Sequence, residues 1–316
     1  MKILVTGGAG FIGSNYIRMM FNRYPDMEIT NLDKLTYAGN PENLRGISNP
    51  GYTFIKGDIC DPDTVKRAME GADAVVHFAA ESHVDRSIED SSVFVTTNLV
   101  GTNTLLNCAL GSDISRFIHI STDEVYGSID VGSFTEEDPL EPSSPYSSSK
   151  AGSDLLALSY KTTYGLPVVV TRCTNNFGPY QYPEKLISLF ITNLIEGKQV
   201  PVYGTGLNVR DWIYVEDHCS GIDFVFNHGQ NGEIYNIGGG NELTNMDITH
   251  RILEMMGRDE SMIRYVEDRK GHDMRYSLDY GKLKRMGWKP EYDFDDALRN
   301  TVSWYMENKR WWKPLK

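Results

Sequence analysis

Two adjacent carboxylates, Asp123 and Glu124, follow directly after the apolar run RFIHI in the stretch STDEVYG. A carboxylic acid can protonate a departing hydroxyl group, and a carboxylate can remove a proton from carbon. Neighbouring acids can divide these two tasks, because like charges at short distance push their pKa values apart. The alternative is that one of the acids only caps a turn, so the surrounding sequence has to distinguish the two interpretations.

A tyrosine and a lysine, Tyr146 and Lys150, lie four residues apart in YSSSK, which places them on one face of a helix. A phenol is a poor base at neutral pH, but a nearby ammonium together with a cofactor cation would stabilise the phenolate and lower its pKa. Such a tyrosine could remove a hydroxyl proton while hydride leaves the carbon. The same spacing is common on helix surfaces, so its meaning depends on the fold.

Three glycines, Gly7, Gly10 and Gly13, follow the first apolar segment in TGGAGFIG and open a helical segment. They allow a tight turn and let a pyrophosphate approach the helix N-terminus. Asp33 ends the second apolar segment and could accept hydrogen bonds from both ribose hydroxyls, which favours NAD over NADP. Lys34 beside it weakens that preference, and a structural turn without a ligand is the alternative interpretation.

Apolar segments and helical segments alternate through the first half of the chain. The predicted strands are KILVTG, EITNLD, YTFIKGD, ADAVVHFAA, RFIHIST and PVVVTRC, all read as buried on both faces. The predicted helices are Phe11 to Arg23, Pro62 to Glu70, about Ser87 to Leu110, and Ser147 to Tyr164. This alternation predicts an α/β fold with a Rossmann-like, doubly wound parallel sheet.

After Cys173 the alternation stops. The short strands VPVYG, EIYNIGG and IRYVED mix there with helices around Leu186 to Gly197, Met246 to Met256 and Phe294 to Trp312. We therefore expect a smaller, interleaved α/β C-terminal substrate lobe. Residues 1–174 would form the NAD-binding domain, with some later segments returning to it, and residues 175–316 would form most of the lobe.

The composition limits the possible partners and compartments. The chain has 316 residues, 40% of them hydrophobic, and a formal net charge of -12, which argues against nucleic acid as the main partner. Its apolar runs are too short to span a membrane, and the N-terminus has no signal-peptide layout. The four cysteines are far apart in sequence, which fits a reducing cytoplasm. The histidines show no metal-ligand spacing, so no metal site is expected.

Taken together, the glycine motif, GDI, FAAESHVDRS, STDEVYG, YSSSK and RDWIYVEDH resemble the extended short-chain dehydrogenase/reductases, and within them most closely the dTDP-glucose 4,6-dehydratases. The resemblance runs from Met1 to about Tyr280, and TDEVYG is its discriminating motif. It implies a hydro-lyase with tightly bound NAD that oxidises C4 of dTDP-glucose, removes water across C5 and C6, and returns the hydride to C6. The product would be dTDP-4-keto-6-deoxyglucose, for deoxysugar biosynthesis such as that of dTDP-rhamnose.

The resemblance also assigns roles to the residues after the fifth strand. Asp123 would be the acid at O6, Glu124 the base at C5, and Thr122 would hydrogen-bond O4, while Tyr146, supported by Lys150, would take the O4 proton. Adjacent residues of an extended strand point to opposite faces. Both acids can therefore meet one hexose only if the strand ends near Thr122 and the chain turns.

Two larger sets of residues complete the predicted site. The cofactor-binding set is Gly7, Gly10, Phe11, Ile12, Gly13, Asp33, Lys34, Leu35, Thr36, Asp58, Ile59, Phe78, Ala79, Ala80, Ser82, Thr97, Tyr146, Lys150 and Asn176. The substrate-binding set is Ser82, Thr122, Asn175, Lys185, Leu186, Pro201, Tyr203, Arg210, Asn245, Arg269 and His272. Arg210, Arg269 and His272 are the candidates for the diphosphate, although Arg210 could instead pair with Asp211, and the two asparagines could simply form turns.

A homodimer is expected from the resemblance, with helices around Val95 to Leu110 and Ser147 to Tyr164 forming a four-helix bundle with their copies. Three other functions stay open. UDP-glucose could replace dTDP-glucose as substrate, the chain could be a sugar nucleotide epimerase or decarboxylase, or it could be a non-catalytic NAD-binding sensor or scaffold.

Overall fold

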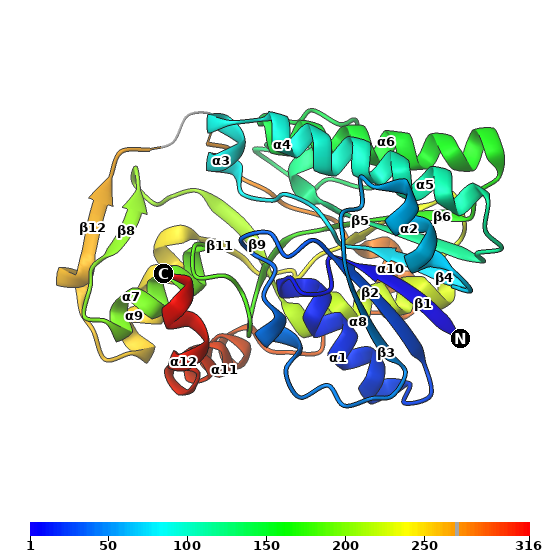
Figure 1. Ribbon diagram of the computed structural model, residues 1–316. Helices are drawn as coiled ribbons and strands as arrows, with labels where there is room; N and C mark the ends of the chain where they lie inside the picture. Colours follow the sequence, from blue (N-terminus) through cyan, green and yellow to red (C-terminus); the bar gives the residue numbers. More distant parts are fainter. Residues whose placement is uncertain (269–271) are drawn as a thin grey trace.

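The computed structural model describes residues 1–268 and 272–316. Within these residues the main sheet has seven strands in the order β10-β6-β5-β4-β1-β2-β3 (Figure 1). All adjacent strands in this sheet pair in parallel. The strands are β1 (Lys2–Thr6), β2 (Glu28–Asp33), β3 (Tyr52–Lys56), β4 (Ala74–His77), β5 (Arg116–Thr122), β6 (Val168–Cys173) and β10 (Ile234–Ile237). The strand order reverses between β1 and β4, and such a reversal opens a crevice at the carboxyl ends of the strands. The predicted Rossmann-like sheet is confirmed.

Helices cover both faces of this sheet (Figure 1). One face carries α1 (Phe11–Arg23), α8 (Val215–His228) and α10 (Gly281–Met286), and the other carries α2 (Pro62–Met69), α5 (Thr102–Leu110) and α6 (Pro145–Tyr164). The alternation of β1 explains the two cores, because Ile3 and Val5 pack on the first face while Leu4 packs on the second. Burial on both sides anchors the strand ends that form the crevice.

The smaller lobe lies beyond the carboxyl ends of the strands (Figure 1). It contains β8 (Val200–Tyr203) paired with β12 (Ile263–Val266), and a small sheet of β7 (Asn175–Phe177), β9 (Val209–Tyr214) and β11 (Glu242–Thr244). Its helices are α7 (Leu186–Ile195), α9 (Asn245–Met255), α11 (Phe294–Glu307) and α12 (Lys309–Trp312), which enclose a separate apolar core. The division of the chain at residue 174 stays a proposal.

The helix predicted over Ser87 to Leu110 is broken. It forms α3 (Val84–Glu89), α4 (Ser92–Phe94) and a π-helical stretch η2 (Val95–Gly101) before α5. Asp90 is extended and its carboxylate accepts the Ser92 N–H, which ends α3. Within η2, Asn98 is fixed by bonds to the backbone N–H and C=O of Glu81 and to the Ser149 hydroxyl. Such π turns occur often at functional sites.

Other predicted elements differ in smaller ways. EIYNIGG was expected in the lobe, but β10 forms the edge of the main sheet beside β6. The outer strand β3 is not buried on both faces, because it forms the opposite edge. The last helix is two helices that meet at Asn308. The short strands β7, β9 and β11 were not predicted. In the described part of the chain, no helix has the length and apolar content needed to cross a membrane.

Candidate active site

A cavity of about 590 Å³ lies where the carboxyl ends of the strands face the smaller lobe. It collects the predicted site residues from both halves of the chain. Its walls include Gly7, Gly10, Phe11, Ile12, Gly13, Asp33, Lys34, Thr36, Asp58, Ile59, Phe78, Ala79, Ala80, Ser82, Thr97, Thr122, Asp123, Glu124, Tyr146, Lys150, Asn175, Asn176, Lys185, Leu186, Pro201, Tyr203, Arg210, Asn245 and His272. Leu35 is not among the wall residues, and Arg269 lies outside the described residues.

The glycine loop brings backbone close to one end of this cavity. Gly7 has φ +72°, and a Cβ atom there would lie 2.6 Å from the Ala79 nitrogen, so only glycine fits. Gly10 caps α1 and has no side chain to bond the first helical amides. Those amides, with the helix dipole, can bind an anion such as a pyrophosphate.

Asp33 is held in a fixed orientation at the end of β2. Its Oδ2 accepts the Ala9 N–H at 2.8 Å, and its Oδ1 accepts the Leu35 N–H at 2.8 Å. Leu35 has φ +56°, and its side chain packs against the apolar core beside α1 instead of lining the cavity. Lys34 forms an ion pair with Asp58, 2.7 Å between Nζ and Oδ2. The positive charge of Lys34 is therefore paired with a protein carboxylate. Since that charge was the reason to consider NADP, the pairing weakens the case for NADP.

β5 ends at Thr122, and a single 3₁₀ turn, η3 (Asp123–Val125), begins at the next residue. The Thr122 hydroxyl caps this turn, since its Oγ1 lies 3.3 Å from the Glu124 nitrogen and 3.2 Å from Asp123 Oδ1. Because the chain turns, Asp123 and Glu124 both reach the cavity wall. The structure therefore meets the condition derived from the sequence, that the strand ends near Thr122 and the chain turns there.

Asp123 is in a setting that favours its protonated form. Its side chain is 3% exposed, and burial, followed by the charge of Glu124, raises its pKa well above the usual range. Its Oδ2 has no hydrogen-bond partner among the described residues. The two acids therefore differ in surroundings, because Glu124 is only partly buried.

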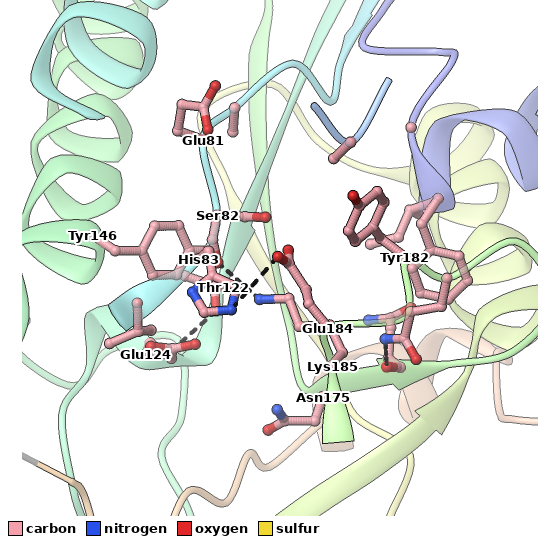
Figure 2. Close-up of a pocket in the computed structure, with 18 of the residues that line it drawn as sticks. Glu81, Ser82, His83, Thr122, Glu124, Tyr146, Asn175, Tyr182, Glu184 and Lys185 are labelled. Carbon is pink, nitrogen blue, oxygen red and sulfur yellow. Dashed lines mark hydrogen bonds and ion pairs between the residues drawn. The ribbon is translucent and has the colours of Figure 1, made fainter. Parts of the chain in front are cut away.

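Local capping positions the tyrosine and the lysine. Ser144 and Ser147 form a capping box at the start of α6, and Pro145 occupies its first turn. Figure 2 shows the Tyr146 ring projecting from α6 toward Thr122. The Lys150 ammonium lies one turn later and donates to the Ile120 carbonyl at 2.7 Å.

Burial opposes ionisation of this pair. Burial, followed by the charge of Glu124, raises the pKa of Tyr146, while a hydrogen bond with Thr122 acts in the other direction. Burial also lowers the pKa of Lys150. The lowered pKa predicted from the sequence includes the positive charge of a cofactor, so it concerns the site with cofactor bound and stays a prediction. The chain's own groups therefore do not supply the full stabilisation of a phenolate.

Several buried polar atoms on the lobe side of the cavity lack protein partners. Among the described residues no hydrogen bond is formed by Asn175 Oδ1, Asn245 Oδ1, Trp212 Nε1 or Thr174 Oγ1. Each of these residues lines the cavity. Since buried polar groups are normally bonded, their concentration at one cavity indicates that it is built for a polar ligand.

Arg210 is buried on the lobe side and is held by backbone. Its guanidinium donates to the carbonyls of Val209 and Asp273 at 2.7 and 2.9 Å and lies 4.2 Å from the centre of the Tyr276 ring. The neighbouring Asp211 accepts backbone N–H groups of residues 239 and 241. Tyr276 also lines the cavity but was not predicted, because RYS carries no recognisable motif.

Glu184 was missed as well, although it connects both sides of the cavity (Figure 2). Its carboxylate accepts the Tyr37 hydroxyl at 2.9 Å and lies 3.7 Å from His83 Nε2. The adjacent Lys185 donates to the Ser82 carbonyl at 3.1 Å. Isolated loop residues such as these leave no periodic signal in a sequence.

Comparisons with known proteins agree with this geometry. A family model described as GDP-mannose 4,6 dehydratase matches residues 4–301. A dTDP-glucose 4,6-dehydratase from Actinoplanes sp. is 54% identical over 319 aligned positions, which cover 99% of this chain and 100% of that protein. The crystal structure of DesIV, a dTDP-glucose 4,6-dehydratase from Streptomyces venezuelae with NAD and TYD bound, is 57% identical, covers 100% of both chains and has a TM-score of 0.98. The chain belongs to the dTDP-glucose 4,6-dehydratase family.

The fold of this family is shared with enzymes that perform other reactions. A UDP-glucose 4-epimerase from Thermus thermophilus, solved in complex with NAD, is 30% identical, covers 98% of this chain and 100% of its own, and has a TM-score of 0.90. The sheet and the lobe are therefore common to dehydratases of this family and to an epimerase. What separates the reactions has to be sought in particular side chains.

Proposed function

We propose that this protein is a hydro-lyase that converts dTDP-glucose to dTDP-4-keto-6-deoxyglucose, using tightly bound NAD, in deoxysugar biosynthesis. The observation that carries the proposal is the turn after β5, which brings two adjacent acids to one cavity wall near Tyr146, one of them buried in surroundings that raise its pKa. The relatives with 54 and 57% identity, named as dTDP-glucose 4,6-dehydratases, support the choice of substrate.

NAD fits the residues at the glycine end of the cavity. The uncapped start of α1 suits its pyrophosphate, and the fixed carboxylate of Asp33 suits a ribose diol. We propose that the predicted cofactor-binding residues hold NAD. Leu35 would contribute through the hydrogen bond from its N–H to Asp33, and not as part of the cavity wall. When bound, NAD supplies an acceptor for the C4 hydride and later returns that hydride to the sugar. The positive ring of bound NAD would be the second cation near Tyr146.

The chain's own side chains then move the protons. Tyr146 takes the proton from the C4 hydroxyl, with Thr122 bonded to the same oxygen. Once C4 is a ketone, the proton on C5 becomes acidic and Glu124 removes it. Hydroxide is a poor leaving group, so Asp123 transfers its proton to O6, and the oxygen leaves as water.

The lobe side of the cavity is proposed to hold the nucleotide. The partly buried Asn175 and Asn245 present buried, unbonded oxygens there, and Arg210 and His272 supply groups for the diphosphate. Ser82, Lys185, Leu186, Pro201 and Tyr203 complete the proposed contacts. The predicted contact of Arg269 remains a proposal from the sequence alone.

The decisive experiment is turnover of dTDP-glucose followed by mass spectrometry, with UDP-glucose in a parallel reaction. A dTDP product lighter by one water is expected, and UDP-glucose is expected to react more slowly. An unchanged mass with altered stereochemistry would indicate an epimerase. Faster turnover of UDP-glucose would assign the other nucleotide, and ligand binding without turnover would indicate a sensor.

We further propose a homodimer formed by helices on the face of the main sheet that carries α2, α5 and α6. Large apolar side chains are exposed there beside polar ones: Val95, Val100, Leu155 and Tyr164. They lie on η2 and α6, which pack against each other on one face of the main sheet (Figure 1), and they form part of the exposed surface of these helices. Pairing with a second copy would bury this surface. The cytoplasm is the proposed compartment, supported by the four free cysteines.

Replacing Leu155, 60% exposed on α6, by arginine is expected to convert the dimer to a monomer, because a charge would be buried at the centre of the bundle. Sedimentation velocity measures the change in mass. Leu207→Arg is the matched control, since Leu207 is 56% exposed on a loop of the lobe and should leave the dimer intact. A Leu155→Arg protein that still sediments as a dimer would contradict this interface.

A further inference from the structure

The C-terminal sequence RWWK forms an aromatic cluster with a residue far away in the chain. Trp304 of α11 and Trp311 of α12 have ring centres 4.8 and 5.8 Å from that of Tyr180. Tyr180 has φ +69°, a conformation that costs free energy for any residue other than glycine. The packing of these rings therefore holds a strained segment in place at the surface of the lobe.

This cluster contacts the helix that follows the glycine loop. The Arg18 guanidinium of α1 lies 4.9 Å from the centre of the Tyr180 ring, and Asn15 of α1 donates to the Pro179 carbonyl at 3.0 Å. Arg18 also donates twice to the Asn43 carbonyl, at 3.0 and 2.7 Å. The cluster therefore extends from the lobe to α1 and to η1 (Pro41–Leu44), which contains Asn43.

Asn43 connects the C-terminal segment to the glycine loop itself. The Trp311 indole N–H donates to Asn43 Oδ1 at 2.8 Å, and Asn43 Nδ2 donates to the Ala9 carbonyl at 2.9 Å. The Ala9 N–H in turn donates to Asp33 Oδ2 at 2.8 Å. Three consecutive hydrogen bonds thus lead from Trp311 to the carboxylate assigned to the ribose.

The Asn43 amide is held from both of its ends. Asn43 is 1% exposed, so its oxygen and nitrogen both need protein partners. An indole can only donate and a carbonyl can only accept, so Trp311 and Ala9 together orient the amide. Without the indole N–H, the buried oxygen would lose its partner, and the amide would hold the Ala9 carbonyl, which also accepts the Asn40 N–H, less firmly.

We propose that Trp311 is a positioning residue for the cofactor. The C-terminal segment slows NAD release because it holds the hydrogen-bonded residues Asn43, Ala9 and Asp33 in their positions. The inference rests on the proposed function, because it needs NAD at the glycine loop. It assigns to RWWK a role beyond packing within the lobe.

The adjacent tryptophan provides a matched control. The Trp312 indole also donates one hydrogen bond of 2.8 Å, but its acceptor is the Tyr305 carbonyl inside the lobe. Trp311→Phe and Trp312→Phe therefore each remove one indole donor from the same short segment. Only the first change breaks the path to the glycine loop.

The experiment uses the purified holoenzyme and measures release of bound NAD by exchange with isotopically labelled NAD, together with thermal unfolding. Trp311→Phe is expected to release NAD about fivefold faster, since one hydrogen bond that favours the bound state is lost. Trp312→Phe is expected to release NAD at the wild-type rate, even where its thermal midpoint falls. With saturating NAD, the kcat of Trp311→Phe should stay near that of the wild type.

Equal release rates for Trp311→Phe and the wild type would overturn the proposal, and so would an equal acceleration in both tryptophan variants. Should Trp311→Phe not fold, Asn43→Asp gives an independent test. It keeps an acceptor for the indole but loses the donor to the Ala9 carbonyl, and it is expected to release NAD faster. A wild-type protein that binds no NAD would refute the proposed function itself, a result that the wild-type measurement alone reveals.

Discussion

Tyr146→Phe is expected to lower kcat by about 10³-fold, the loss typical of a positioned general base. The variant lacks the oxygen that removes the C4 hydroxyl proton, so oxidation at C4 cannot begin. The aromatic ring stays in place, because it packs against Phe94 with ring centres 6.3 Å apart. The fold and the binding of substrate should therefore be retained.

The measurement is the absorbance of reduced nicotinamide after mixing the holoenzyme with dTDP-glucose in a single turnover. No rise in this absorbance is expected for Tyr146→Phe. Tyr160→Phe is the control, since Tyr160 lies on the same helix but its hydroxyl donates to Asn103 and Asn107 of α5, away from the cavity. A normal rise in the Tyr146→Phe variant would exclude this tyrosine as the base.

The surroundings of Tyr146 explain why a cation must act with it. Burial and the charge of Glu124 both raise its pKa, and the Lys150 ammonium is bonded to the Ile120 carbonyl. A phenolate in this site would be costly without a positive charge nearby. The YSSSK motif by itself predicts the two residues on one helix face, but it cannot predict the depth of burial that sets the direction of the shift.

The sequence was most informative where a periodic pattern or a dense motif was present. The buried strands, the glycine loop and the YSSSK helix were predictable, because hydrophobic periodicity and backbone chemistry specify them locally. The break at η2 was not, since it depends on Asn98 bonding to Glu81 and Ser149, which are distant in sequence. Strands of three residues such as β7 and β11 also leave too short a pattern to detect.

Long-range contacts account for the remaining omissions at the site. Tyr276 and Glu184 reach the cavity only because the lobe folds over the carboxyl ends of the strands. Trp311 and Asn43 meet across most of the chain length. No local pattern encodes such pairs, so the contact between Trp311 and Asn43 cannot be found from the sequence alone.

Asp123→Asn and Glu124→Gln are each expected to reduce dehydration by about 10² to 10⁴-fold, but to stop the reaction at different points. Both variants retain Tyr146, so oxidation at C4 should still occur in each. Glu124→Gln lacks the base for C5 and should show no exchange of the C5 hydrogen with deuterated solvent. Asp123→Asn keeps that base and should exchange C5 while failing to expel O6.

The pH dependence follows from the surroundings of Asp123. Its folded pKa lies above the unfolded value, so folding takes up a proton there, and this contribution to stability is lost as pH rises from the unfolded pKa to the folded one. Dehydration should likewise fall as pH rises through the folded pKa of Asp123. In Asp123→Asn this alkaline decline should be absent from the residual rate.

The two acids can be told apart because the turn at Thr122 gives them unequal surroundings. Asp123 is buried, and its oxygen Oδ1 lies beside the Thr122 hydroxyl, while Glu124 is partly exposed at the cavity wall. Full C5 exchange in Glu124→Gln would reject Glu124 as the base. If Asp123→Asn blocked C5 exchange and Glu124→Gln did not, the roles would be reversed, with Asp123 as the base at C5 and Glu124 as the acid at O6. Asp123 would then have to lose its proton once the sugar has been oxidised to the C4 ketone.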